Sequence, residues 1–183
     1  MISTLKSCRI LTATLIPLTL IACATPLTDG TSYNKGVEAY RAKDYTNARV
    51  HWSRAVDDGN ISALNNLGYL FYYGLGGGAD PERAVSLWMK GAMAGHSEAQ
   101  WHLGRAFEDG KGTRRDYIQA YAWYRCALAS SQAGTGVDQD AERQIAEDVK
   151  TSLVILVDKL SPEQFDRGAH LAKQYIAMYV KPN

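Results

Sequence analysis

The middle of this sequence repeats itself every 36 residues, and this repeat constrains the fold more than any other feature. Leu67 and Gly68 return 36 residues later as Leu103 and Gly104. The other matching pairs include Trp52 and Trp88, Phe71 and Phe107, Gly74 and Gly110, Gly76 and Gly112, Asp80 and Asp116, and Ala84 and Ala120. A period of this length indicates a stacked array of small supersecondary units. Such arrays usually bind other macromolecules and rarely perform chemistry.

Each repeat unit has the pattern of two helices joined by a glycine-containing turn. Leu64, Leu67 and Phe71 are spaced i, i+3 and i+7, which places them on one face of a helix. Gly68 lies between them and has no side chain, so a neighbouring helix can approach closely. The second helix is expected to begin at Asp80-Pro81, because aspartate is a good N-cap and proline fits the first helical position.

These motifs resemble a known family of helical repeats. Leu64-x2-Leu67-Gly68-x2-Phe71, followed by Ala84-x3-Trp88, resembles the tetratricopeptide pattern. The longer period and the Gly-x-Gly turn resemble its Sel1-like relative. The resemblance implies an all-α fold, a short right-handed superhelix of antiparallel helix pairs.

The array is expected to span residues 33–133 and to be capped at both ends. Units 62–95 and 98–133 match the Sel1-like pattern, whereas unit 33–59 has a shorter turn and is predicted to cap the start. Residues 138–183 depart from the repeat and are predicted to form a closing helical pair. Its first helix is expected at residues 141–160. Its second helix is expected to begin at the capping box Ser161-Pro162-Glu163-Gln164 and to end near residue 180.

The N-terminus has the form of a bacterial lipoprotein signal. Lys6 and Arg9 precede an apolar stretch, residues 10–22, which is too short to span a bilayer as a helix. The following Leu20-Ile21-Ala22-Cys23 resembles a lipobox. The resemblance implies removal of residues 1–22, acylation of Cys23 with a fatty acid such as palmitate, and a lipidated tether at residues 23–32. An ordinary secretory signal or an uncleaved anchor are the alternatives.

Compartment and charge narrow the class of partner. Ala24 follows the lipidated cysteine, which favours an outer-membrane lipoprotein facing the periplasm; the inner membrane or a secreted periplasmic form are the alternatives. Cleavage removes two basic residues and no acidic one, which leaves 18 Lys and Arg against 19 Asp and Glu. This balance argues against a nucleic-acid partner, which usually requires a basic stripe. Membrane attachment would then come from the lipid on Cys23.

Several motifs resemble catalytic or ligand-binding signatures without completing one. Gly110-Lys111-Gly112-Thr113 lacks the spacing of a phosphate loop. The four histidines lack ligand-like spacing, so no metal site is predicted, and no cofactor is implied. Ser97 is interpreted as an N-cap, although a hydrolase using Ser97, Glu98 and His102 remains the weakest alternative. Cys126 lies in an apolar helical run and is interpreted as a buried structural thiol.

One stripe of the first helices is the predicted binding surface. In tetratricopeptide-like arrays the first helix of each unit lines the concave face. The stripe beside the core positions lies three residues before the glycine, one after it and four after it, and these offsets share one face. The candidate partner-binding residues on it are Tyr33, Tyr40, Asn65, Tyr69, Tyr72, Trp101, Arg105 and Glu108. Aromatic and hydrogen-bonding side chains of this kind are typical of recognition surfaces. Packing of some rings between units or against the C-terminal helices is the alternative.

The sequence therefore predicts a membrane-anchored periplasmic adaptor or scaffold. Its partner is expected to be a protein or peptide bound along the concave face, and no enzymatic activity is expected. The alternative is an accessory of cell-wall or exopolysaccharide assembly that binds glycan through the same aromatic side chains.

Overall fold

The computed structural model describes residues 31–134 and 138–180, and within them every regular element is an α-helix. Cys23 and the signal-like segment lie outside these residues. The helices are α1 (Thr31–Arg41), α2 (Tyr45–Asp57), α3 (Ile61–Tyr73), α4 (Pro81–Met93), α5 (Ser97–Asp109), α6 (Tyr117–Gln132), α7 (Gln139–Val157) and α8 (Pro162–Tyr179). The predicted all-α fold is confirmed.

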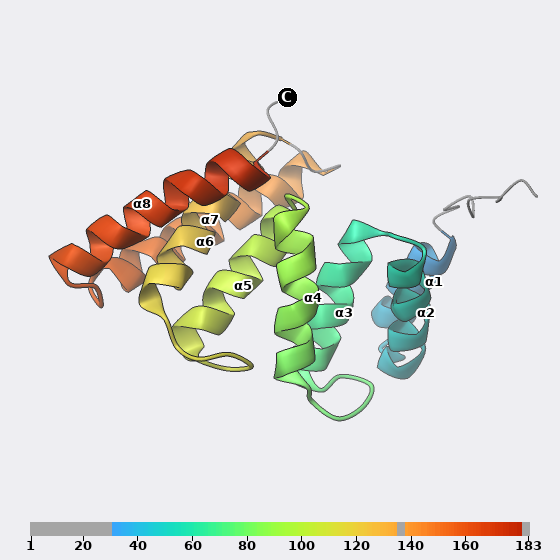
Figure 1. Ribbon diagram of the computed structural model, residues 1–183. Coiled ribbons are helices and arrows are strands. Elements are labelled where there is room, and N and C mark those ends of the chain that lie inside the picture. Colours follow the sequence, from blue (N-terminus) through green and yellow to red (C-terminus); the bar gives the residue numbers. More distant parts are fainter. Residues whose placement is uncertain (1–30, 135–137, 181–183) are drawn as a thin grey trace, which may run out of the picture.

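Consecutive helices form pairs that stack one after another (Figure 1). The pairs α1–α2, α3–α4 and α5–α6 correspond to the three predicted units. Helices α7 and α8 both pack against α6, and α8 also reaches α4. Figure 1 shows this last pair covering the α6 end of the stack, opposite α1. No helix in residues 31–134 or 138–180 is long and apolar enough to cross a membrane.

The glycine in the first helix of each unit makes room for an aromatic ring from the second helix. A Cβ added at Gly36 would lie 2.3 Å from Trp52, one at Gly68 would lie 2.6 Å from Trp88, and one at Gly104 would lie 2.5 Å from Tyr124. The expected close approach is thus confirmed, and the approaching group is an aromatic side chain.

The two tryptophans are also held by hydrogen bonds. Trp52 Nε1 donates to the carbonyl oxygen of Tyr33 at 3.2 Å, and Trp88 Nε1 donates to that of Asn65 at 3.1 Å. Both acceptors lie three residues before the glycine, so the arrangement repeats from unit to unit. Tyr124 has no indole and instead donates its hydroxyl to Glu108 Oε2 at 2.7 Å.

The two glycines of each Gly-x-Gly turn have different roles. Gly74 and Gly110 end α3 and α5 in the left-handed conformation, with φ of 72° and 68°. Gly76 and Gly112 also have positive φ, and a Cβ on either would lie 2.3 Å from backbone of the preceding unit, at Tyr45 and Pro81 respectively. The second glycine therefore lets each turn pack against the start of the preceding unit's second helix.

Helix boundaries follow the predicted caps with two corrections. Asp80, Asp116 and the Ser161 capping box begin α4, α6 and α8 as expected. Ser97 is not the N-cap of α5: His96 is, and its Nδ1 accepts from the Ala99 N–H at 3.3 Å. Helix α7 starts two residues earlier than predicted because Asp138 caps it, and it ends at Val157 rather than residue 160.

Candidate binding groove

Two adjoining hollows form a groove along the first helices of the units. The first, here called the aromatic hollow, has a volume of about 500 Å³ and is lined by α1, α2, α3 and α5. The second, the polar hollow, has a volume of about 460 Å³ and extends from α1 and α3 to the start of α7. Tyr33, Asn66 and Glu98 line both hollows, so the two adjoin, and together they are called the groove.

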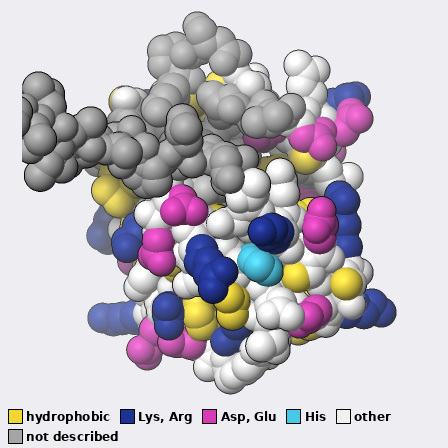
Figure 2. Space-filling view, turned by 90° about the vertical axis from the view of Figure 1, so that its right-hand side faces the viewer, with side chains coloured by type: hydrophobic (Ala, Val, Ile, Leu, Met, Phe, Trp, Pro, Cys, Tyr) yellow, Lys and Arg dark blue, Asp and Glu magenta, His cyan; other side chains and the backbone are white. Residues whose placement is uncertain are grey.

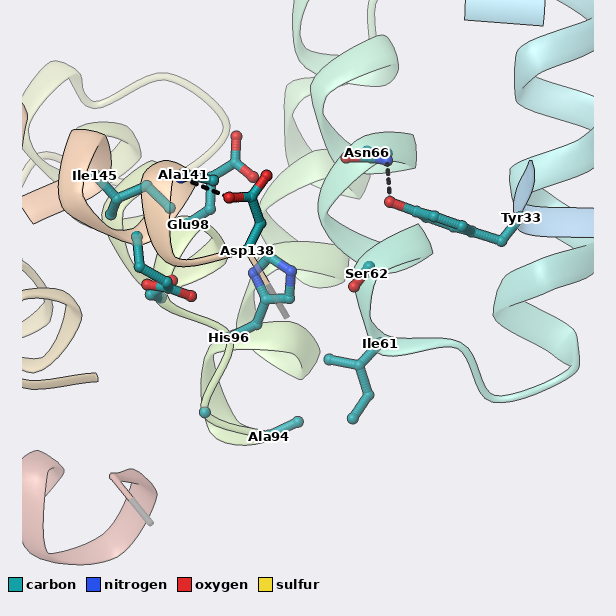
Figure 3. Close-up of a pocket in the computed structure, with 13 residues that line it drawn as sticks. Tyr33, Ile61, Ser62, Asn66, Ala94, His96, Glu98, Asp138, Ala141 and Ile145 are labelled. Carbon is teal, nitrogen blue, oxygen red and sulfur yellow. Dashed lines mark hydrogen bonds between the residues drawn. The ribbon is translucent and has the colours of Figure 1, made fainter. Parts of the chain in front are cut away.

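Hydrogen bonds between side chains connect the units along this groove. Asn66 Nδ2 donates to the Tyr33 hydroxyl at 3.3 Å and joins α3 to α1. Asn65 Nδ2 donates to Glu98 Oε2 at 2.9 Å and joins α3 to α5. Figure 3 shows Tyr33 and Asn66 on one side of the polar hollow and His96, Glu98 and Asp138 on the other. These hydrogen bonds hold the polar side chains of the groove in fixed positions.

Aromatic rings form the wall of the first hollow. The Tyr40 ring lies 5.6 Å from that of Trp52 and 6.5 Å from that of Tyr69, measured between centroids. Tyr69 also contacts the ring of His102 at 5.9 Å. Burial raises the pKa of the Tyr40 hydroxyl, and the nearby Tyr69 and Glu98 raise it further.

Glu98 places a negative charge in the middle of the groove. Burial alone would raise the pKa of this carboxyl. His102, His96 and Asn65 outweigh burial and hold the pKa of Glu98 below its ordinary value, so the carboxylate stays ionised near neutral pH. His102 Nε2 lies 3.8 Å from Glu98 Oε1. On α7, burial raises the pKa of Glu142, and the charge of Glu98 contributes in the same direction.

The structure brings four of the predicted binding residues together in the groove. These four, Tyr33, Tyr40, Asn65 and Tyr69, all line the aromatic hollow. Tyr72 must be corrected, because it is only 5% exposed and its ring packs 5.0 Å from that of Trp88. Lys111 of the next turn lies 4.1 Å from the centre of the Tyr72 ring. Tyr72 is therefore a core residue.

The predicted residues of the third unit lie outside both hollows. Trp101 Nε1 donates to Ser152 Oγ on α7 at 3.3 Å, and the Arg105 guanidinium lies 5.5 Å from the Trp101 ring. Glu108 accepts hydrogen bonds from Tyr124 and from Lys159. Helix α7 and the turn that follows it thus occupy the surface that the sequence assigned to a partner at Trp101 and Glu108. Of the two roles considered for Trp101, partner binding and packing against the C-terminal helices, the structure shows the packing.

The sequence reasoning did not name several groove residues as binding candidates, among them Asn66, Glu98, Asp138 and Glu142. Asn66 is adjacent to Asn65, and Glu98 lies about one helical turn before Trp101. A wider stripe around these predicted positions would have included both residues. Asp138 and Glu142 belong to α7, outside the repeat, and no periodicity in the sequence indicates that α7 reaches this surface.

The groove lacks the geometry expected of the hydrolase alternative. Ser97 is 3% exposed and interacts with Glu142 rather than with a histidine. His102 is stacked between Trp88 and Trp101, with ring centroids 4.9 and 5.0 Å away. A nucleophile needs a base within hydrogen-bond reach, which these contacts do not provide. The residues described also hold no group of three or more histidine, cysteine or acidic side chains suited to a metal ion.

The α1–α2 end of the molecule carries charges of both signs. Figure 2 shows Lys and Arg side chains interspersed with Asp and Glu over the coloured part of this face, with small apolar areas between them. No continuous basic stripe crosses that part of the face, in keeping with the charge balance of the sequence.

The fold and groove define a helical-repeat protein of stacked helix pairs, and comparison with known families specifies the repeat. Residues 61–96 and 97–132 each match the Sel1 repeat. The chain thus carries two Sel1 repeats, which correspond to α3–α4 and α5–α6. The predicted resemblance is confirmed for these two units.

Two curated proteins illustrate where similar arrays occur. The chain is 30% identical over 136 residues to the alginate biosynthesis protein AlgK of Pseudomonas syringae pv. tomato, covering 74% of this chain and 28% of AlgK. It is 32% identical over 100 residues to HRD3B of Arabidopsis thaliana, an ERAD-associated E3 ubiquitin-protein ligase component, covering 54% of this chain and 17% of HRD3B. The chain thus spans less than a third of either relative.

Two solved structures have a similar fold. One is c5321, a protective antigen of uropathogenic Escherichia coli with an SLR fold; the TM-score is 0.68 and the sequence identity is 26%. The match covers 81% of this chain and 30% of the c5321 chain. The other is a Sel1 repeat protein from Oxalobacter formigenes, at a TM-score of 0.51 and 23% identity over 81% of this chain and 78% of that one.

Proposed function

We propose that this protein is a non-catalytic adaptor that binds a protein or peptide in the groove along α1, α3 and α5. The observation that carries the proposal is the groove of two adjoining hollows, in which rings and hydrogen-bonded polar groups from three successive units meet. Fixed aromatic and amide side chains at the centre of a hollow favour recognition of an extended segment. HRD3B, named as a component of a ligase, is consistent with a role in assembly.

The proposal is tested by crosslinking inside cells from a photoreactive amino acid placed at Tyr69. A matched control carries the same group at Lys90, which is exposed on α4. We expect one defined protein, identified by mass spectrometry, to be captured from position 69 and not from position 90. Folded protein that captures nothing from position 69, or the same proteins from both positions, would contradict the adaptor function.

The adaptor is further proposed to be held at the outer membrane, facing the periplasm, by lipid on Cys23. The support is the lipobox-like Leu20-Ile21-Ala22-Cys23 and the following Ala24. Replacing Cys23 with serine should move the protein from the membrane to the soluble fraction. A Cys8→Ser variant, altered inside the signal-like segment, is the control and should stay at the membrane. Full membrane association of the Cys23→Ser protein would rule out the lipid anchor.

A second candidate function is glycan binding as an accessory of exopolysaccharide or cell-wall assembly. The observation that favours it is the similarity to AlgK, which is named as an alginate biosynthesis protein. The aromatic wall of the groove could stack on sugar rings. Co-sedimentation with alginate or peptidoglycan separates the two functions: retention that disappears on Tyr69→Ala would favour glycan, and no retention would favour a protein partner.

A further inference from the structure

The aromatic hollow has π-faces on its walls and acceptors at its end. Its rings come from Tyr33, Tyr40 and Tyr69, with Trp52 below them. The faces of such rings carry partial negative charge and attract cations within about 6 Å of the ring centre. An apolar side chain could also fit between the rings, so the polar groups of the hollow decide which ligand fits best.

A hydrogen bond joins two of the polar side chains of this hollow, Asn65 and Glu98. Asn65 is 2% exposed, and its Nδ2 donates to the Glu98 carboxylate, which fixes the orientation of the amide because an ionised carboxylate can only accept. The Asn65 Oδ1 atom is therefore the free acceptor, and it has no hydrogen-bond donor. This oxygen is itself buried, so the acceptor that an entering N–H group can reach is the Glu98 carboxylate.

Glu98 adds a full negative charge beside these rings. Its side chain is 40% exposed, so a ligand can reach it from the groove. Arg41 lines the same hollow as a cation, but it is exposed and lies at the end of α1. On the side of Glu98, the polar hollow continues with the carboxylates of Asp138 and Glu142. The groove is thus acidic along the direction in which a bound segment would continue (Figure 3).

We propose that the aromatic hollow receives a lysine or arginine side chain of the partner, with the cation against the rings of Tyr40 and Tyr69 and its N–H groups directed to Glu98. The proposal rests on the adaptor function and specifies its partner as a basic segment of protein. The hollow of about 500 Å³ is within the usual range of small-ligand sites, about 300–1,000 Å³, and accommodates either side chain.

Nuclear magnetic resonance titration of the purified full chain tests this inference. The probes are the Nα-acetyl amides of lysine and arginine, the equivalent amide of norleucine as the uncharged match for lysine, and methyl glucoside as a neutral sugar. We expect the two cations to shift the Trp52 indole N–H and the Asn65 side-chain amide saturably, with dissociation constants of about 1 mM. Norleucine and the sugar should cause no saturable shift.

Variants then assign the binding to particular groups. Glu98→Gln should weaken lysine binding about tenfold, because hydrogen bonds to charged groups are the stronger ones. Glu82→Gln, a matched change at an exposed glutamate of α4, should leave it unchanged. Tyr69→Leu should weaken binding several-fold, whereas Tyr69→Phe, which keeps the ring, should not. Folding of each variant is checked by its thermal unfolding.

Several outcomes would overturn the inference: norleucine binding as tightly as lysine, equal affinities for Glu98→Gln and the unaltered protein, or shifts with the sugar alone. Failure of this inference can be distinguished from failure of the adaptor function. Capture of one protein from position 69 without cation binding leaves the adaptor and removes the basic partner. Cation binding without any captured protein leaves the cation site and removes the adaptor.

Discussion

The indole of Trp88 lies so close to Gly68 that any side chain at residue 68 would overlap it. A Cβ at Gly68 would lie 2.6 Å from Trp88 Nε1 and 2.8 Å from Cδ1. The indole cannot move aside easily, since it is 1% exposed and donates to the Asn65 carbonyl. Gly36 packs against Trp52, and Gly104 against Tyr124, in the same way. The packing of each unit therefore requires one glycine in its first helix and one large ring in its second.

Gly68→Ala is expected to destabilise the protein, although alanine is the better helix former. The gain in helix propensity is about 1 kcal/mol, and overpacking a rigid core costs about 1–3 kcal/mol, more where an overlap is this severe. We expect a net loss of about 1–3 kcal/mol in the free energy of unfolding, measured by urea denaturation. Gly78→Ala is the control, because a Cβ there meets nothing within 4 Å. Equal stabilities of the two variants would contradict this packing argument.

Gly76→Ala should be more damaging than Gly59→Ala, although both glycines have positive φ. The values are 74° at Gly76 and 83° at Gly59, so the conformational cost of about 1–2 kcal/mol is shared. At Gly59 a Cβ meets nothing within 4 Å, whereas at Gly76 it would lie 2.3 Å from the Tyr45 backbone of the preceding unit. The difference between their urea midpoints therefore reports the contact between units. If both variants lose the same stability, the turn does not hold the units together.

The repeat predicted the parts of the fold that recur and missed those that do not. Leu67, Ala84 and Trp88 are buried as expected, because their spacing repeats and one helical face must be apolar. Gln100 interrupts the apolar stripe but is fully buried, and its Nε2 donates to the Ala92 carbonyl at 3.0 Å. A polar residue can occupy a core position when the end of the preceding helix supplies an acceptor, which periodicity alone does not reveal.

The candidate site was predicted well only where the array itself forms it. Tyr33 and Asn65, each three residues before the glycine of its unit, both line the groove because neighbouring first helices present equivalent positions to the same side. Trp101 occupies the equivalent position in the third unit, yet it bonds to Ser152, 51 residues away on a helix outside the repeat. Tyr72 is covered by Lys111 from the next turn. Both misplacements come from contacts between segments whose pairing no local pattern encodes.

His96 should make the stability of the protein depend on pH between neutral and mildly acidic conditions. Burial lowers the pKa of this imidazole in the folded protein, His102 lowers it further, and Glu98 only partly opposes them. The unfolded chain, with an ordinary pKa of about 6.5, then binds the proton more readily. The free energy of unfolding contributed by His96 therefore falls as pH decreases through about 6.5 towards the lowered pKa of the folded state.

His96→Asn removes this titration and keeps the cap. Asn60 is the N-cap at the equivalent position of the preceding unit, with φ −73° and ψ 116° against −74° and 111° at His96. We expect the variant to match the unaltered protein at pH 7.5 and to be the more stable one at pH 5.5, by urea denaturation. His96→Ala, which loses the cap, should cost about 1 kcal/mol at pH 7.5. The same pH dependence with histidine and with asparagine would show that His96 is not responsible.

Cys126 should be inert to thiol reagents until the protein unfolds. The residue is fully buried, and burial raises the pKa of its thiol to about 12. At pH 8 only about one molecule in 10,000 would carry the reactive thiolate, and the reagent would still have to reach the core. Iodoacetamide labelling, quantified by mass spectrometry of the Cys126 peptide, should be negligible in native protein and complete in concentrated urea. A Thr151→Cys variant provides an exposed thiol on α7 as the positive control. If native Cys126 reacted as fast as that control, the α6 core would have to open on the timescale of the reaction, which its packing beneath the closing helical pair argues against.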